Sequence, residues 1–336
     1  TQASQLRKVF RSKSAQSRQI GVDLLNESSI NLKMGLIEWS MVLCLSILWG
    51  MSFFLVELLI DELLPLTIVL LRVGIAATTL WAIVRILGLP FPRRIGTWTA
   101  FLVMGLLNNV IPFTLIVVGQ IHIASGLAAI LNATTPIFTM LVAGALLTDE
   151  RLTAAKLSGA VLGLSGVAIM IGPEALQGIG ENLLSQLAIL GAALSYAFAF
   201  VFGRRFKKQG LHPVTTAAGQ VSGSTMLLIP VVFYFQEPGA LIQLSLTGWG
   251  AVAMLGVFST GAAYVLFFGI LGRAGTTNAA IVTLLIPVWA ILLGSLLLGE
   301  ILQARHIAGM ALIALGLAAI DGRPLQWLTK ASARTK

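Results

Sequence analysis

Ten apolar stretches, each of roughly 20 residues, occupy most of this chain. A membrane-spanning helix needs about 20 apolar residues, and the composition agrees, with 57% hydrophobic and only 10% charged residues. The stretches are continuously apolar and do not alternate at period two, which predicts helices and argues against a barrel. We therefore expect an all-α integral membrane protein with ten transmembrane helices. The predicted spans are 38–58, 65–86, 98–118, 123–147, 153–171, 183–203, 213–234, 248–271, 276–298 and 303–320.

The stretch 124–172 returns in recognisable form as 275–322. Each copy holds two apolar segments joined by a short charged turn. Such duplication is typical of transporters that place a binding site between related halves. The matching landmarks are Ala129 and Ala280, Pro136 and Pro287 and, after a one-residue deletion, Glu150 and Glu300, Gly159 and Gly309, and Gly166 and Gly316.

The earlier parts of the two halves match more weakly. Pro65 and Pro213 each open an apolar segment, and Arg72 and Gln220 follow seven residues later. Proline is well tolerated in the first turn of a helix. The sequence therefore predicts two repeats of five helices each, over residues 38–172 and 183–322.

Basic residues indicate how the chain lies in the bilayer. If the N-terminus is cytoplasmic, 20 of the 22 Lys and Arg residues fall on the inner side, as the positive-inside rule requires. Both termini are then cytoplasmic, and five spans per repeat make the repeats inverted. We expect a multi-pass protein of the plasma membrane. The net charge of +9 is explained by the lipid bilayer as partner, and nucleic acid is not an expected partner.

The two ends of the chain are polar. Residues 1–33 have no apolar run that could pack into a core and are predicted to be a disordered tail, and 323–336 to be a basic cytoplasmic tail. Because Met34 directly precedes the first span, it stays open whether 1–33 belongs to the native protein. The single cysteine, Cys44, allows no disulfide within one chain, and we expect neither a cofactor nor a metal site.

The residues in this order resemble the EamA-type permeases of the drug/metabolite transporter superfamily. The resemblance rests on the segment Ser46–Gly50, on the Pro65 to Arg72 spacing, and on a repeated proline, glutamate and glycine-rich last helix. It implies a secondary transporter that exports or exchanges a small metabolite or drug by alternating access between inverted repeats. The second half departs from the first at Gln220 and Tyr196. Solute, coupling ion, direction and oligomeric state stay open.

Two prolines at matching positions indicate where a binding site lies. Pro136 and Pro287 fall near the middle of the fourth and ninth spans. A proline inside a helix removes a backbone hydrogen bond and exposes acceptors, and paired helix breaks at midplane are typical of transporter sites. The alternative is that both only kink helices for packing.

Polar and aromatic residues gather near the predicted midplane. Polar groups in hydrocarbon cost free energy unless they face partners or a water-filled cavity. A cavity lined by such residues offers stacking surface and hydrogen bonds. For any one residue, interhelical hydrogen bonding or plain packing explains its place at least as well. The candidate substrate-binding residues are Trp49, Asn108, Asn132, Tyr196, Tyr264 and Trp289.

Arg72 lies inside the second span, two turns from the helix start, whereas the other basic residues fall near span ends, in loops or in the tails. A buried arginine needs a partner. The partner is either a bound anionic group, such as a substrate carboxylate, or a structural one, namely Glu57, helix-end carbonyls or nearby polar side chains. The sequence favours the structural role for Arg72, with Gln220 as its counterpart in the second repeat.

An enzyme hypothesis rests on the fifth span. Gly163-Leu164-Ser165-Gly166 matches the G-x-S-G pattern of intramembrane serine hydrolases. A serine nucleophile needs a base within reach, but His122, His212 and His306 fall at helix ends. The same glycines recur every three or four residues, as close helix packing requires. We therefore expect a transporter and no enzyme, with a hydrolase or a structural membrane protein as the alternatives.

Overall fold

A computed structural model describes residues 34–123, 125–150, 152–172, 181–235, 244–298 and 303–321. Within these residues the secondary structure is helical and contains no strand, which confirms the all-α prediction. The predicted tails 1–33 and 323–336 lie outside the described residues, as does Glu300.

The first half holds five membrane spans, two of which are interrupted. Its helices are α2 (Leu36–Ile60), α3 (Pro65–Ile86), α4 (Ile95–Gly105), the π-helix η1 (Leu106–Val110), α5 (Ile111–Gln120), α6 (Ser125–Asn132), α7 (Thr135–Leu146) and α8 (Ala154–Ile171). Pro65 occupies the first turn of α3, as expected. The Thr153 side chain accepts a hydrogen bond from the Lys156 backbone and caps α8.

The second half repeats this order. Its helices are α10 (Leu183–Lys208), α11 (Pro213–Phe235), α12 (Leu246–Gly256), the π-helix η3 (Val257–Ala262), α13 (Ala263–Ala280), α14 (Val282–Leu298) and α15 (Ala304–Asp321). All ten predicted apolar segments coincide with helices. Over the described residues, eight helical stretches are long and apolar enough to cross a membrane. The stretch 246–280 extends into the ninth segment, which α14 completes, and the apolar helix α15 is the tenth.

Contacts at the helix ends show that the two repeats are inverted. Glu38, at the start of α2, pairs with Arg273 at 2.8 Å, and both Arg273 and Arg204, near the end of α10, line one cavity. The first helix of one repeat therefore begins where the first helix of the other ends. We call this side the Arg204 face. On the opposite face, Glu62 after α2 accepts hydrogen bonds from Ser245 at the start of α12.

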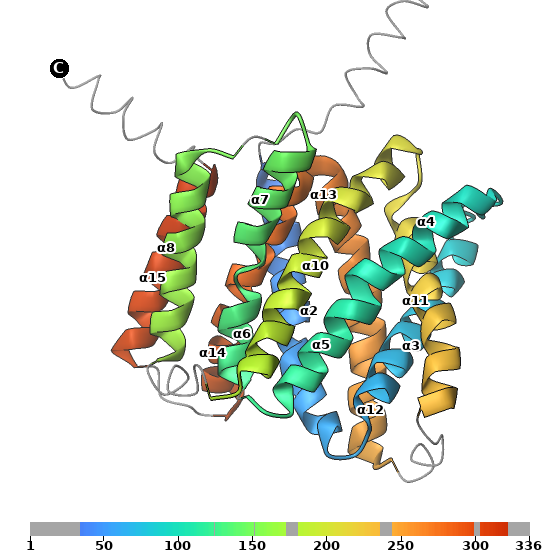
Figure 1. Cartoon of the computed structure of the whole chain (residues 1–336), viewed down its shortest axis with the longest axis horizontal. Helices are drawn as coiled ribbons and strands as arrows, with labels where there is room; N and C mark the ends of the chain where they lie inside the picture. The colour runs from blue at the N-terminus through green and yellow to red at the C-terminus, as the bar shows by residue number, and fades with distance from the viewer. Residues whose placement is uncertain are drawn as a thin grey trace, which may run out of the picture.

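The helices form one elongated bundle. Figure 1 shows α8 and α15 side by side at one end, α3 and α11 together toward the other, and α2, α6, α7 and α10 between them. The inner helices come from both repeats, so the space that they enclose lies between the repeats.

Glycines hold α8 against α15. A Cβ atom on Gly159 would lie 2.7 Å from the Gly316 carbonyl oxygen, and one on Gly166 would lie 2.7 Å from that of Gly309. Small residues allow such close approach of helix backbones. Ser165 is exposed and its hydroxyl donates to the Val161 carbonyl at 2.9 Å. The glycine pattern of the fifth span is thus used for packing.

The third helix of each repeat becomes a π-helix in the middle of the membrane span. Helices α4 and α12 are each 11 residues long and start at residues 95 and 246, which are 151 positions apart, as are Pro136 and Pro287. Each continues into a π-helix, η1 or η3. Such π-segments are frequent at functional sites. The continuous apolar pattern of these two spans does not reveal the interruptions.

The predicted proline breaks are only partly matched. Span four is interrupted at Ala133 and Thr134, and Pro136 lies in the first turn of α7, where its missing N–H costs nothing. Span nine is interrupted at Ile281, whereas Pro287 lies inside α14. Both spans are therefore interrupted in their middle part. In span nine, however, the interruption precedes the proline by more than one helical turn.

We expect Gly166→Ala to lower the unfolding temperature in detergent, because the added methyl group would push α15 away and overpacking costs about 1–3 kcal/mol. Gly250→Ala is the matched control, since no atom lies within 4 Å of its Cβ position. Equal unfolding temperatures for the two variants would contradict the packing role of the glycine stripe.

Candidate functional site

A cavity of about 60 Å³ lies between the two repeats. We call it the central cavity. Its walls come from α2, α3, α5 and α6 of the first repeat and from α10, α13 and α14 of the second. The lining residues are Trp49, Ser52, Phe53, Val56, Arg72, Phe113, Ile116, Val117, Gln120, Asn132, Tyr196, Phe200, Tyr264, Thr283 and Ile286.

Four of the six predicted substrate-binding residues line this cavity, namely Trp49, Asn132, Tyr196 and Tyr264. Arg72 lines it as well. Asn108 is buried and Trp289 is half-buried, but neither lines the cavity. The roles of these residues in binding stay a prediction.

Arg72 is 5% exposed and contacts three neighbours. Its Nε donates to the Thr260 hydroxyl at 3.2 Å and its Nη2 to the Ser52 hydroxyl at 3.2 Å. Its guanidinium carbon lies 3.7 Å from the centre of the Phe113 ring, a distance at which a cation is attracted to the ring face. Of the expected structural partners, the structure therefore supplies polar side chains; the Glu57 side chain lies outside the described part.

These partners carry no charge. Among the described side chains, which do not include that of Glu57, no carboxylate forms an ion pair with Arg72. An arginine at the centre of a span costs about 2.5–3.5 kcal/mol on insertion scales. Hydroxyl dipoles and an aromatic face offset part of this cost and leave the charge in place.

The π-helix η1 supplies a buried amide network. Asn108 donates from Nδ2 to Gln220 Oε1 at 3.0 Å, and Asn109 donates to the Ser224 hydroxyl at 2.6 Å. The Tyr264 hydroxyl donates to the Asn108 carbonyl at 3.1 Å and contacts the Asn109 amide oxygen. Gln220, which stands at the repeat-related position of Arg72, thus joins the two halves and does not line the cavity.

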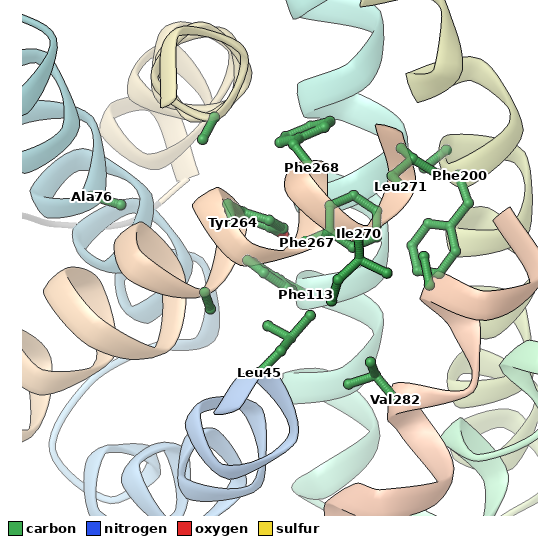
Figure 2. Close-up of a cluster of buried hydrophobic side chains, with 14 of the residues drawn as sticks. Leu45, Ala76, Phe113, Phe200, Tyr264, Phe267, Phe268, Ile270, Leu271 and Val282 are labelled. Atoms are coloured by element: carbon green, nitrogen blue, oxygen red, sulfur yellow. The ribbon is translucent and has the colours of Figure 1, made fainter. Parts of the chain in front are cut away.

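Aromatic contacts continue from the cavity toward the Arg204 face. Trp49 packs edge-on against Tyr264, with ring centres 6.3 Å apart, and lies 5.8 Å from Phe267. Phe267 in turn lies 4.8 Å from Phe200 and 5.1 Å from Phe268. Figure 2 shows these α13 side chains gathered with Phe113 and Phe200 in the buried cluster. We call Trp49, Phe200, Phe267 and Phe268 the aromatic layer.

A second cavity, of about 400 Å³, lies beyond the aromatic layer. Phe206 and Phe268 line it together with the basic residues Arg204, Lys207 and Arg273. We call it the inner cavity. Since Trp49 and Phe200 line the central cavity and Phe268 lines the inner one, the aromatic layer separates the two.

Glu150 ties the repeats together at the Arg204 face. Its carboxylate is 2% exposed and accepts hydrogen bonds from the backbone N–H groups of Thr276 and Thr277 at 2.7 and 3.0 Å. These N–H groups begin a helical turn after Gly275, whose φ of 87° breaks α13. The start of a helix carries a partial positive charge, which favours a carboxylate there. Arg204 Nη1 lies 3.4 Å from Glu150.

Asp149 completes this cluster as the second carboxylate held by Arg204, with Nη1 donating to Oδ1 at 2.8 Å. The hydrogen bond from Arg204 holds the pKa of Asp149 below its ordinary value of 3.8. Because that pKa is depressed on folding, the contact is present at neutral pH and is lost only as the pH falls through the acidic range.

The sequence pattern does not reveal several lining residues. Ser52, Gln120 and Thr283 are single polar residues and Phe113 is a single aromatic one, and such residues in an apolar span are as common in packing as in binding. Gln120 has a usable signal in the sequence, since it lies two residues after the apolar segment 98–118, whose polar residues are Thr99, Asn108, Asn109 and Thr114. Glu150 was noticed only as a landmark of the repeat.

The fold and this site define a polytopic helical transporter whose cavity lies between two inverted repeats. The chain belongs to the EamA-like transporter family, which matches it twice, over residues 36–172 and 183–320. It is therefore a membrane transporter and not an enzyme. Among the described residues no group of His, Cys, Asp and Glu is placed to hold a metal ion.

Relatives of this chain bear transporter names. An "uncharacterized transporter" of Archaeoglobus fulgidus is 27% identical over 83% of this chain and 97% of its own. A "probable amino-acid metabolite efflux pump" of Salmonella typhimurium is 25% identical over 82% of this chain and 92% of its own. A solved crystal structure shares the fold with a TM-score of 0.69 at 20% identity, covering 83% of this chain and 94% of the other.

We expect Tyr264→Phe to lower the free energy of unfolding by about 0.5–1.5 kcal/mol, the usual net contribution of a hydrogen bond. The ring contacts stay and only the hydroxyl that joins α13 to η1 is lost. Tyr234→Phe is the matched control, because Tyr234 is 82% exposed. Unfolding in detergent measures both, and an unchanged stability of Tyr264→Phe would contradict a structural role for the amide network.

Proposed function

We propose that this protein is a secondary transporter that moves a small metabolite across the plasma membrane by alternating access. The observation that supports this proposal best is the central cavity between the inverted repeats, which the aromatic layer separates from the inner cavity, lined by Met41 and by α10, α11 and α13 of the second repeat. A solute in the central cavity would reach the inner cavity only after this layer and the Glu150 contacts open. The inverted repeats give a physical reason for two such states, because each repeat can adopt the arrangement of the other.

The central cavity extends toward the opposite face in this state. Its lining includes Val56, near the end of α2, and Gln120, the last residue of α5, and these helices end on that face. On the Arg204 face, Glu150, Arg204 and Asp149 bind the repeats to each other. We therefore assign this arrangement to a state closed at the Arg204 face.

Basic residues support a cytoplasmic Arg204 face. Arg204, Arg205, Lys207 and Lys208 end α10, and Arg273 lies beside them. Cytoplasmic ends of spans retain such residues. The names of relatives support the class of solute and the direction, since proteins of Salmonella typhimurium and Escherichia coli are named as amino-acid metabolite efflux pumps. Export or exchange of amino-acid-like metabolites is therefore the favoured activity.

Purified protein in liposomes tests this function. We expect counterflow: liposomes preloaded with an unlabelled amino acid or related metabolite take up the same labelled solute, and protein-free liposomes do not. Absence of counterflow for every member of a panel of amino acids and metabolites, with protein shown to be folded and inserted, would overturn the proposal.

We further expect Glu150→Gln to open the Arg204 face. The neutral amide attracts Arg204 and the helix start at Thr276 and Thr277 less strongly than the carboxylate does. With Cys44 replaced by alanine, spin labels at Thr148 and Gln209, exposed on that face in different repeats, should show an added population at longer distance.

Glu62→Gln is the matched control for this experiment. Glu62 also accepts hydrogen bonds at a helix start, from the Ser245 backbone at 2.8 Å and the Ser245 hydroxyl at 2.7 Å, but on the opposite face. The distance distribution across the Arg204 face should be unchanged in this variant. If Glu150→Gln gave the wild-type distribution, the Glu150 contacts would not be what closes that face.

A further inference from the structure

Several polar side chains that line the central cavity are at least nine-tenths buried, and three of them matter for binding. Arg72 and Asn132 are each 5% exposed and Gln120 is 9% exposed. In the described part of the chain, neither side-chain atom of the Gln120 amide has a hydrogen-bond partner, and the Asn132 amide oxygen has none either. Buried polar atoms in proteins are nearly always paired. These atoms line the cavity, so a ligand there would satisfy them.

The hydroxyl partners of Arg72 orient its guanidinium and leave it able to bind an anion. Nε and Nη2 are engaged by Thr260 and Ser52, while Nη1 has no hydrogen-bond partner among the described residues. A guanidinium binds a carboxylate through two parallel hydrogen bonds. The ring of Phe113 covers one face of the group, so an anion paired with Arg72 would approach in the plane of the donors or from the other face.

The rest of the cavity lining combines hydrogen-bond acceptors, aromatic rings and an apolar surface. The oxygen atoms of Gln120 and Asn132 can accept hydrogen bonds from an ammonium group, and Trp49 and Tyr264 contribute aromatic rings, whose faces attract cations. The remaining surface is apolar and comes from Phe53, Val56, Ile116, Val117 and Ile286.

We propose that the central cavity binds an apolar α-amino acid, whose carboxylate pairs with Arg72 and whose ammonium group is received by Gln120 and Asn132. This inference rests on the proposed transport function and names its substrate class. It also gives Arg72 a ligand-binding role in addition to the structural one that the sequence favours.

Three solutes of similar size test separately the contribution of the carboxylate and that of the ammonium group to binding. L-leucine has both groups, L-leucinamide has the ammonium group alone, and 4-methylpentanoate has the carboxylate alone. We expect labelled leucine to undergo counterflow in liposomes, 4-methylpentanoate to compete with it, and leucinamide to compete about tenfold less well than unlabelled leucine, as expected for the loss of a charge-assisted contact.

Variants then assign the charge selection to Arg72. In Arg72→Gln, leucine and leucinamide should compete about equally, whereas Arg72→Lys should retain part of the preference for leucine. Gln120→Leu and Asn132→Leu provide a test that does not depend on the folding of Arg72→Gln, since, among the described residues, neither amide atom of Gln120 nor the amide oxygen of Asn132 has a hydrogen bond that the substitution would break. Both should weaken leucine binding in detergent, measured as a smaller ligand-induced rise in unfolding temperature.

Thr139→Val is the matched control. The Thr139 hydroxyl is also buried and without a partner among the described residues, but Thr139 lies on α7 outside the cavity lining. Its variant should bind leucine as the wild type does.

The outcomes separate this inference from the proposed function. Counterflow with no preference for leucine over leucinamide, or restricted to solutes without a carboxylate, overturns the inference and leaves transport standing. Unchanged leucine binding in both Gln120→Leu and Asn132→Leu also overturns it. Absence of counterflow for every solute tested overturns the proposed function, and the inference with it.

Discussion

The cost of an unpaired backbone group in the bilayer governs this structure. Each such group costs several kcal/mol in hydrocarbon, so spans are helical and irregular backbone is tolerated only inside the protein or beside a cavity. The interruptions follow that rule. The π-helices η1 and η3 and the breaks at Ala133 and Ile281 lie on the inner helices that surround the central cavity, whereas α8 and α15, at the edge of the bundle, are regular.

The interrupted spans also bring polar groups to the centre of the bundle. Asn108 and Asn109 lie in η1, and Ser259 and Thr260 at the matching place in η3. The first pair forms the amide network with Gln220 and Ser224, and Thr260 accepts the hydrogen bond from Arg72. One repeat thus uses its π-helix to join the halves, while the other uses it to hold a charge at the cavity. The two repeats share the π-helix, but a few different residues in it give the two copies different contacts.

The charged residues at the Arg204 face connect the two repeats. Glu150, Asp149 and Arg204 connect the loop after α7 to the end of α10 and to the first turn after Gly275. This turn begins the ninth span, which contributes Thr283 and Ile286 to the wall of the central cavity. The contacts of Glu150 and part of the cavity wall therefore lie on the same span.

The sequence by itself determined the all-α membrane class, the ten apolar segments and the duplication, because hydrophobic length and repeated landmarks are local properties of the chain. It also identified Trp49, Tyr196, Tyr264, Asn132 and Arg72 as buried polar or aromatic residues in need of partners. Only the tertiary structure decided which of them share a cavity. Asn108 and Gln220 bind each other, whereas Gln120 and Ser52 line the cavity. These contacts join residues that are far apart in the chain. The direction in which each side chain points depends on how the helices pack and on where their turns are interrupted.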